Sequence, residues 1–474
     1  MSASTGTRGD AVDAEEGEGR AGSSPPPDLG HPISCVTRAV NYPFLPGMAS
    51  CFADYLGMAM LTPALPYFLS DLGLSATAVA TWTGAITTAQ YAGAACGNMA
   101  VGAMGDALGS RATLGATLLG DVALFTATAF STNVTTLIVV RCLAGVSSPL
   151  VASLHYILRR ATSKKHTLEG VNAYSVSVNA GYAFGSVMVG LGYDALGWVG
   201  LNVLSAVVAG GALVAVLALV KKEPPSAKRS PSVLRALGEL RRPDAGADGS
   251  RDAAGRGAND AVNDAFSVYR TGAMVSHMVT AVNVGYQFMG FLVLFVLMAK
   301  QILRWSPATL GWSFMAIPIV NTLVMYYVIP PLIARFGVHA LITYGSVCTM
   351  LTLGAFAVPA VHTSPAGVMA VTVSLVLCVV TVQVPNQMRI KLIADAFAPE
   401  AMGKITGASR VCFAVGQTAS PAVCAVLYTI HPSLAIGSMF LAVATVPIAF
   451  FLCGQAFFVD PVAKEAEEAP NASC

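Results

Sequence analysis

Charged residues are scarce in this 474-residue chain, since Asp, Glu, Lys and Arg together make up only 11% of it. Soluble proteins carry about 25% charged residues, so this composition does not suit a water-facing surface. Hydrophobic residues, in contrast, make up 55% of the chain. A soluble globule, a secreted disulfide scaffold and a disordered regulator are therefore disfavoured, and a polytopic helical membrane protein is expected.

Sequence patterns for metal, redox and nucleotide chemistry are also missing. The ten cysteines are scattered, mostly through apolar stretches, with no CxxC pair and no His/Cys cluster at metal-ligand spacing. No nucleophile–base pair, nucleotide-binding loop or basic patch stands out. An enzyme, a metal site, a cofactor and a nucleic-acid partner are therefore not expected. The cysteines are interpreted as small buried hydrophobic residues.

What the chain does contain is a series of apolar runs of roughly 18 to 25 residues, long enough to cross about 30 Å of hydrocarbon as helices. They lie near 46–69, 79–101, 112–130, 134–158, 168–193, 197–220, 271–299, 308–332, 338–360, 366–389, 402–428 and 433–457. This pattern predicts an all-α membrane protein with twelve transmembrane helices. They are arranged as six plus six, in residues 43–220 and 269–458.

Three polar segments flank these bundles. Residues 1–42 carry an acidic run and a Pro-rich stretch, which predicts a disordered cytosolic tail. This tail lacks the basic start and short apolar core of a cleavable signal peptide, so the first span is expected to direct the chain to the membrane. Residues 221–268 are interpreted as a cytosolic linker loop, and residues 459–474 as a cytosolic tail.

The placement of Lys and Arg predicts the orientation of the spans. With the N-terminus in the cytosol, only Lys300 and Arg304 fall on the outer side, and Arg141 and Arg410 lie within spans. All other Lys and Arg residues are then cytosolic. Because positively charged loops stay in the cytosol, both termini are expected inside. The pattern is equally compatible with a plasma membrane and an internal membrane.

The loop between the expected second and third spans carries Gly102, Asp106, Gly109 and Arg111. Its glycines permit a tight turn, and Asp106 can accept hydrogen bonds at a helix N-terminus or pair with a base. The spacing resembles the signature loop of the major facilitator superfamily, with Ser110 in one of the basic positions. The resemblance implies a transporter of two pseudo-symmetric six-helix bundles, in which Asp106 and Arg111 latch the two halves on the cytosolic side.

The first and fourth spans are similar to those of the 12-span drug:proton antiporters in that superfamily, notably tetracycline efflux proteins and vesicular amine transporters. Asp54 precedes the Pro63-Ala-Leu-Pro66 segment by nine residues, as an acid does in those proteins. Arg141-Cys-Leu-Ala-Gly145 looks like their Arg-x-x-x-Gly motif. The resemblance implies proton-coupled efflux.

The fifth span carries Gly181, Gly185 and Gly190, and resembles the antiporter-type helix motif except that Gly185 is followed by Ser instead of Pro. The segment from Gly416 to Pro421 has the same spacing as that from Gly181 to Ser186, so spans five and eleven are predicted to be repeat partners. Residues 334–337 look like a copy of the signature loop. Such repeats are expected where two halves rock around a site at the membrane midplane.

Polar residues follow one face of several expected spans, at offsets of three, four or seven. Unpaired amides are costly in hydrocarbon, so these faces must meet each other or water. Hydrogen bonds between helices and a central aqueous cavity are both open interpretations. The candidate cavity residues are Asn179, Asn283, Gln287, Gln383, Asn386 and Arg410.

Away from the span ends, four charged residues lie inside expected spans, and such residues are functional candidates because their burial is costly. Asp54 is predicted to carry a proton, with a structural ion pair as the alternative. Asp121 is interpreted either as a second proton-coupling residue or as half of a buried ion pair. Arg141 is expected to modulate the proton on Asp54. Arg410 aligns with the polar face of span five and is expected to face the cavity, with the cytosolic interface as the alternative.

These patterns predict a secondary active transporter that moves a small organic solute by alternating access and proton-coupled efflux. One alternative is an exporter or uptake carrier of organic anions that uses Arg141 and Arg410. An alternative of another class is a non-transporting membrane sensor or scaffold. The expected partners are a small-molecule substrate, protons and the lipid bilayer, and the chain is expected to act as a monomer.

Overall fold

The computed structural model describes residues 42–160, 164–221, 272–356 and 399–453, together with residues 373, 377, 378, 381, 382, 384, 385 and 388. Every secondary-structure element in these residues is a helix. The described part thus has the all-helical architecture expected from the sequence. Almost all of the two expected tails, the linker loop after residue 221 and most of the expected span near 366–389 lie outside the described residues.

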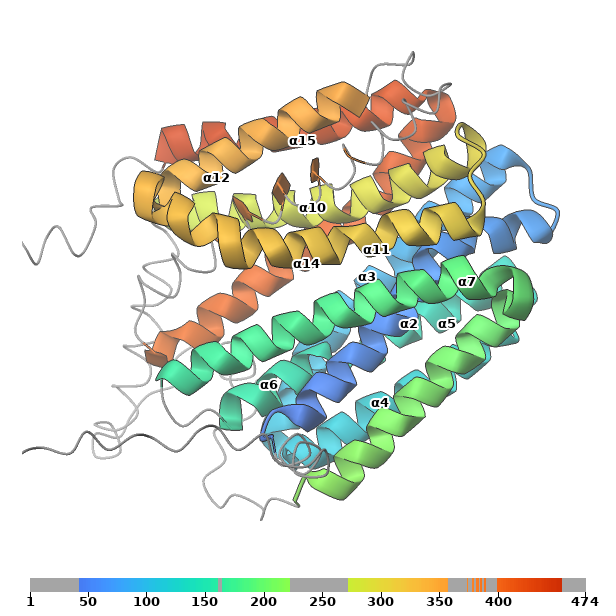
Figure 1. The fold of residues 1–474 in the computed structure, drawn as a ribbon, viewed down its shortest axis with the longest axis horizontal. Helices are drawn as coiled ribbons and strands as arrows, with labels where there is room; N and C mark the ends of the chain where they lie inside the picture. Colours follow the sequence, from blue (N-terminus) through green and yellow to red (C-terminus); the bar gives the residue numbers. More distant parts are fainter. Residues whose placement is uncertain are drawn as a thin grey trace, which may run out of the picture. The chain divides into compact units, whose positions relative to one another are not determined.

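Six helices cover the described residues up to 221, which we call the N-terminal half. They are α2 (Leu45–Asp71), α3 (Ala76–Leu108), α4 (Ser110–Ala129), α5 (Val134–Ser147), α6 (Leu150–Arg160) and α7 (Lys164–Leu219) (Figure 1). Helices α5 and α6 form one expected span, whereas α7 contains two, because its backbone turns at Gly197 with φ = 60°. Ser75 and Asn133 cap α3 and α5, since each side chain accepts a hydrogen bond from the backbone N–H three residues later.

The described residues from 272 onward form the C-terminal half. Its elements are α10 (Gly272–Gln301), α11 (Pro307–Leu323), the π-helical turn η1 (Val324–Val328), α12 (Ile329–Phe356), α14 (Pro399–Ile430) and α15 (Pro432–Cys453). Every expected span except the one near 366–389 overlaps a described helix. Within the described residues, six helices are long and apolar enough to cross a membrane, and the bent pair Ile329–Gly337 and Ala340–Gly354 raises this number to seven.

The same pairing of helices occurs within each of the two halves (Figure 1). Helix α2 packs along α7 in the N-terminal half, and α10 packs along α14 in the C-terminal half. Between the halves, α3 packs on α14 and α7 packs on α11. Counted as spans, the second therefore contacts the eleventh and the fifth contacts the eighth. This is the pairing that a pseudo-twofold relation between the halves would give, because the second span then corresponds to the eighth and the fifth to the eleventh.

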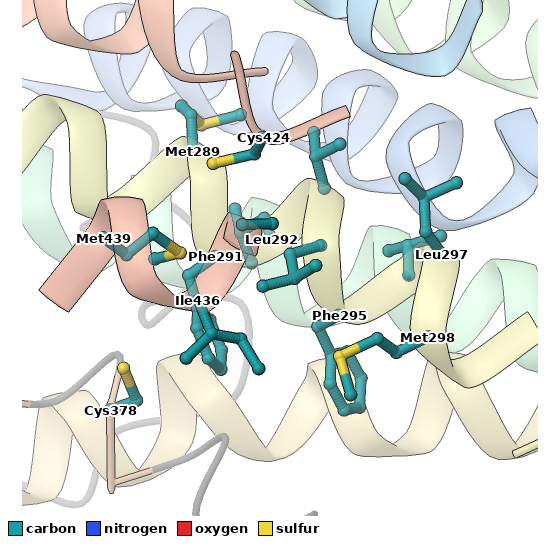
Figure 2. Close-up of a cluster of buried hydrophobic side chains, with 14 of the residues drawn as sticks. Met289, Phe291, Leu292, Phe295, Leu297, Met298, Cys378, Cys424, Ile436 and Met439 are labelled. Atoms are coloured by element: carbon teal, nitrogen blue, oxygen red, sulfur yellow. The ribbon is translucent and has the colours of Figure 1, made fainter. Parts of the chain in front are cut away.

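Helix α10 lies at the centre of the C-terminal half. Its segment Phe291–Ala299 is buried on every side. Figure 2 shows this cluster, in which Met289 and Phe291 of α10 lie near Cys424 of α14 and Met439 of α15. A helix that is apolar all round is stable only when other helices or lipid surround it. The uninterrupted apolar run of this segment is therefore explained by its central position.

Candidate functional site

A buried carboxylate lies in α2. Asp54 is only 4% exposed, and its Oδ2 accepts a hydrogen bond of 3.0 Å from the Oγ of Ser148. The side chain therefore faces the interior of the N-terminal half, where a bare carboxylate would be costly. Its hydrogen-bond donor is 94 residues further along the chain.

Ser148 lies in a break between α5 and α6. Helix α5 ends at Ser147, Ser148 has ψ = 128°, and Pro149 has no N–H with which to continue the helix. The break directs two adjacent hydroxyl groups to different carboxylates: Ser148 donates to Asp54 of α2, and Ser147 donates to Oδ1 of Asp121 of α4 at 3.5 Å. Two carboxylates from two helices thus meet one two-residue segment.

The guanidinium of Arg141 is enclosed in the same region. The residue is 1% exposed, its Cζ lies 5.7 Å from the ring centre of Phe125, and its Nη1 lies 3.5 Å from Oγ1 of Thr128. Its charge is within electrostatic reach of both Asp54 and Asp121. Among the described atoms, Nε of Arg141 and Oδ2 of Asp121 have no hydrogen-bond partner. The arrangement combines two carboxylates, one cation and unsatisfied polar atoms, all inside one helix bundle.

The two halves are joined at the end that carries the α2–α3 and α10–α11 connections. The Oη of Tyr67 donates a hydrogen bond of 2.7 Å to the backbone carbonyl of Trp305. Nζ of Lys300 donates to the carbonyl of Pro66 and lies 4.8 Å from the ring centre of Tyr67. The side chain of Gln301 donates to the first carbonyl of α3 at 2.9 Å. We call this set of contacts the closed end.

Two glycines next to the closed end let the backbones of the halves touch. A Cβ at Gly84 of α3 would lie 2.6 Å from the carbonyl oxygen of Pro421, and one at Gly311 of α11 would lie 2.5 Å from the carbonyl oxygen of Ser186. A helix backbone cannot rotate out of the way as a side chain can. Any opening at this end must therefore separate α3 from α14 and α7 from α11.

A model of the Major Facilitator Superfamily matches residues 47–388. The chain belongs to the major facilitator superfamily. A small-molecule substrate and a membrane setting follow from this membership, because the superfamily consists of membrane transporters. No curated protein sequence matches the chain.

Solved structures of transporters share the fold. A mutant of the nucleoside transporter NupG has 12% identity and a TM-score of 0.65, with 86% of this chain and 99% of that chain covered. The human organic anion transporter MFSD10 (TETRAN) has 16% identity and a TM-score of 0.59, with coverages of 87% and 98%. The POT family transporter PepTSo has 14% identity and a TM-score of 0.65, with coverages of 90% and 99%. At these identities the likeness shows the fold alone.

The residues of the major facilitator signature motif lie in the last turns of α3, at Gly109 between the helices and in the first turn of α4, so most of the expected loop is helical. Gly109 adopts φ = 83° and ψ = 164°, and Gly337, in the similar segment of the C-terminal half, adopts φ = 76° and ψ = 166°. Because this conformation is essentially restricted to glycine, both loops need glycine at this point. Nη2 of Arg111 donates to the carbonyl of Leu217 at 2.7 Å, within the N-terminal half. Gly102 and Asp106 lie in α3, and the side chain of Asp106 is outside the described atoms.

The glycines of the antiporter-type motif lie where helices approach each other. A Cβ at Gly181 would lie 2.5 Å from a backbone carbonyl oxygen of α2, and one at Gly416 would overlap a carbonyl oxygen of α10. Gly185 also faces α2, whereas Gly190 faces the start of α11 in the other half. Gly181 and Gly416 thus occupy equivalent places in the two halves, as their repeat spacing suggests.

The candidate cavity residues have different surroundings. Nδ2 of Asn179 donates to Oγ1 of Thr322 at 3.1 Å, a bond between the halves. Asn283 and Gln287 instead donate to α15, within the C-terminal half: Asn283 to a backbone carbonyl and to a threonine hydroxyl at 2.9 Å, and Gln287 to a carbonyl at 2.6 Å. Both line a cavity of about 10 Å³, which is at the limit for one water molecule.

Arg410 is exposed and lies on α14. Its charge is within electrostatic reach of Tyr55 of α2 and Tyr174 of α7, so it lies close to the N-terminal half. Gln383 and Asn386, the remaining candidate cavity residues, lie outside the described residues.

Ser147, Ser148 and Tyr67 are not among the candidate site residues that the sequence predicts. The sequence does indicate a helix break next to the two serines, because Pro149 lies inside the expected span 134–158 and a proline there interrupts a helix. No local signal identifies Tyr67, because its hydrogen-bond partner is 238 residues away.

Proposed function

We propose that this protein is a proton-coupled exporter that exchanges protons for a small organic solute by alternating access. Asp54 carries the proton, Asp121 shares in proton binding, and Arg141 modulates both. Asn179 and Arg410 contribute to solute contact between the halves. The bundles comprise residues 43–220 and 269–458, and both termini are cytosolic.

The observation that carries this proposal is the hydrogen bond from Ser148 to the buried carboxylate of Asp54. A buried carboxylate is costly when charged, and it accepts hydrogen bonds most strongly in that form. Binding a proton therefore changes both its charge and its bond to the α5–α6 break. A group that changes charge at a point where a helix is interrupted suits the coupling of proton binding to helix movement.

In the proposed cycle, the closed end corresponds to one state of alternating access. With the N-terminus in the cytosol, as the distribution of Lys and Arg predicts, the closed end faces away from the cytosol. In this proposal the structure represents the inward-facing state, which receives solute from the cytosolic side. Separation of Tyr67 from Trp305 then accompanies release on the other side.

Proton movement in proteoliposomes tests this proposal. A pH-sensitive dye inside the vesicles reports protons while small organic cations and anions are screened as solutes. Solute-driven proton flux is expected for the wild type and for Asp71→Asn, a control on the same helix whose side chain is exposed. The flux is expected to vanish in Asp54→Asn. The sign of the flux distinguishes exchange from co-transport.

Two outcomes contradict this proposal. Solute uptake without proton flux, unchanged by Asp54→Asn, indicates a facilitator in which Asp54 is structural. Absence of uptake for every solute, together with a cellular activity that survives Asp54→Asn, indicates a non-transporting sensor or scaffold.

A second candidate function is transport of organic anions, and the exposure of Arg410 favours it. An exposed guanidinium that lies close to the other half is placed to bind a carboxylate or phosphate of a solute. Arg141 does not share this position, because it is enclosed in the N-terminal half. Arg410→Ala is expected to abolish anion uptake and to spare cation uptake, with Arg335→Ala as a matched exposed arginine. Equal uptake of anions by Arg410→Ala and the wild type contradicts this candidate.

A further inference from the structure

We propose that Asp54, Asp121 and Arg141 form a single unit that binds one proton, and that the hydroxyls of Ser147 and Ser148 position its two carboxylates. This inference rests on the proposed proton coupling and specifies its site. Its components come from three helices. The two acids meet at the α5–α6 break, where the two serines donate to them at 3.5 and 3.0 Å.

The charges of the unit determine how many protons it takes up. When both acids are ionised, two negative charges face the single positive charge of Arg141, which is within electrostatic reach of both. One proton makes the unit neutral, and a second leaves an uncompensated positive charge in a buried site. Because isolated buried charge is costly, the first proton binds readily and the second is strongly disfavoured. The proton therefore belongs to the pair and not to either acid.

Other titratable groups near Asp54 leave this balance intact. Cys51 and Tyr55 of α2, Tyr91 of α3 and Tyr174 of α7 are within electrostatic reach of Asp54, and all four are neutral in their ordinary forms. Arg410 of α14 acts on Cys51, Tyr55 and Tyr174, but it is not among the groups that act on Asp54. Among the described residues, Arg141 is accordingly the cation that balances the two acids.

The packing around the break keeps the serines in place. A Cβ at Gly120 of α4 would lie 2.5 Å from the Oγ of Ser147, so the absence of a side chain there makes room for this hydroxyl next to Asp121. A Cβ at Gly145 of α5 would overlap a backbone carbonyl oxygen of α3, so α5 rests directly on α3. The end of α5 is thus held firmly, and the hydroxyls have defined positions relative to both acids.

Two kinds of measurement on purified full-length protein test the unit without a solute. Potentiometric titration counts the protons bound, and infrared difference spectroscopy follows the carboxylic acid C=O band. As the pH is lowered, the unit is expected to take up one proton in the wild type and none in either Asp54→Asn or Asp121→Asn. Each single variant leaves one acid that is already balanced by Arg141. If Asp54 and Asp121 titrated independently, each variant would lose only the proton of the acid it replaces. That result would overturn the proposal.

The serine variants test the positioning role. A hydrogen bond to a charged group contributes about 1.5–3 kcal/mol, so Ser148→Ala is expected to move the midpoint of the transition to higher pH by about one to two units. A smaller move in the same direction is expected for Ser147→Ala and for Gly120→Ala, which displaces Ser147. Ser148→Thr keeps the hydroxyl and restores the midpoint. Ser177→Ala removes a buried hydroxyl that donates to a carbonyl of its own helix, and it is expected to leave the midpoint unchanged.

An unchanged midpoint in Ser148→Ala, in protein that remains folded by its thermal transition, overturns the positioning role. The proteoliposome experiment separates this failure from that of the proposed function. Proton flux together with independent acids refutes only the single unit, whereas one shared proton without any solute-driven flux refutes the coupling to transport.

Discussion

The hydroxyl of Tyr67 donates a hydrogen bond of 2.7 Å to the backbone carbonyl of Trp305, which lies 238 residues further along the chain. The bond joins the end of the first span to the connection between the seventh and eighth. Together with the contacts of Lys300 and Gln301, it holds the two halves together at the closed end. A transporter that works by alternating access must break these contacts in each cycle.

Tyr67→Phe is expected to shift the protein toward a state that is open at this end. Loss of one hydrogen bond of about 0.5–1.5 kcal/mol raises the population of the open state about two- to tenfold. Spin labels on Leu72→Cys and Ile302→Cys, two exposed sites at this end, report the distance between the halves. Tyr193→Phe is the control, because Tyr193 bonds to Asp71 within one half. An identical distance distribution in Tyr67→Phe and the wild type contradicts this role.

Gly311→Ala is expected to prevent full closure between α11 and α7. The added Cβ would lie 2.5 Å from the carbonyl oxygen of Ser186, closer than real Cβ atoms approach backbone. The spin-label distance at the closed end should increase, and transport should slow. Gly354→Ala is the matched control, because a Cβ there meets nothing within 4 Å. If Gly311→Ala transports at the wild-type rate with the halves still closed, the close contact is not needed for function.

Asn283→Ala is expected to lower stability more than solute affinity. The amide of Asn283 bonds to a backbone carbonyl and to Thr445 of α15, and such bonds in membranes contribute about 0.6 to 2 kcal/mol each. The thermal midpoint in detergent should therefore fall, with the KM for transport nearly unchanged. Asn179→Ala provides the contrast, since Asn179 bonds across the two halves. An increase in KM without loss of stability in Asn283→Ala would instead place this residue in the solute site.

Trp198→Ala is expected to lower the stability of the N-terminal half. The indole stacks on Phe68 with ring centres 4.1 Å apart, and its Nε1 donates to the carbonyl of Thr128 at 3.0 Å. Loss of a buried Trp side chain costs roughly 3 kcal/mol or more in protein cores. Trp198→Phe keeps the stacking and should retain most of this stability. Equal thermal midpoints for the two variants would show that the ring contributes little.

The apolar runs predict the described helices well, because each run needs only its own composition to become a membrane span. The similarity of residues 334–337 to the signature loop indicates a bend at Gly337, and both loops do share one backbone conformation. The break at Ser148 is less evident from the sequence. A span that contains a proline can bend, kink or separate into two helices, and its neighbours decide among these outcomes.

Partner choice among the polar residues could not be predicted. Asn179 and Asn283 both lie on polar faces of apolar helices, so helical periodicity treats them alike. In the structure, Asn179 bonds to the other half and Asn283 bonds within its own half. The difference arises from which helices surround each face, and helix pairs such as α10 and α15 are far apart in the chain.

The amino-acid sequence alone is enough to predict the membrane-spanning helical character of this protein, its superfamily and the presence of Asp54, Asp121 and Arg141 within its spans. Composition and local spacing suffice for these features, since hydrocarbon requires long apolar helices and makes each buried charge conspicuous. The contacts of Ser147 and Ser148 with the two acids, and the hydrogen bond from Tyr67 to Trp305, become visible only in the folded protein. These contacts depend on how separate helices pack. The bonded residues are 94 and 238 positions apart, so the sequence around each one does not indicate its partner.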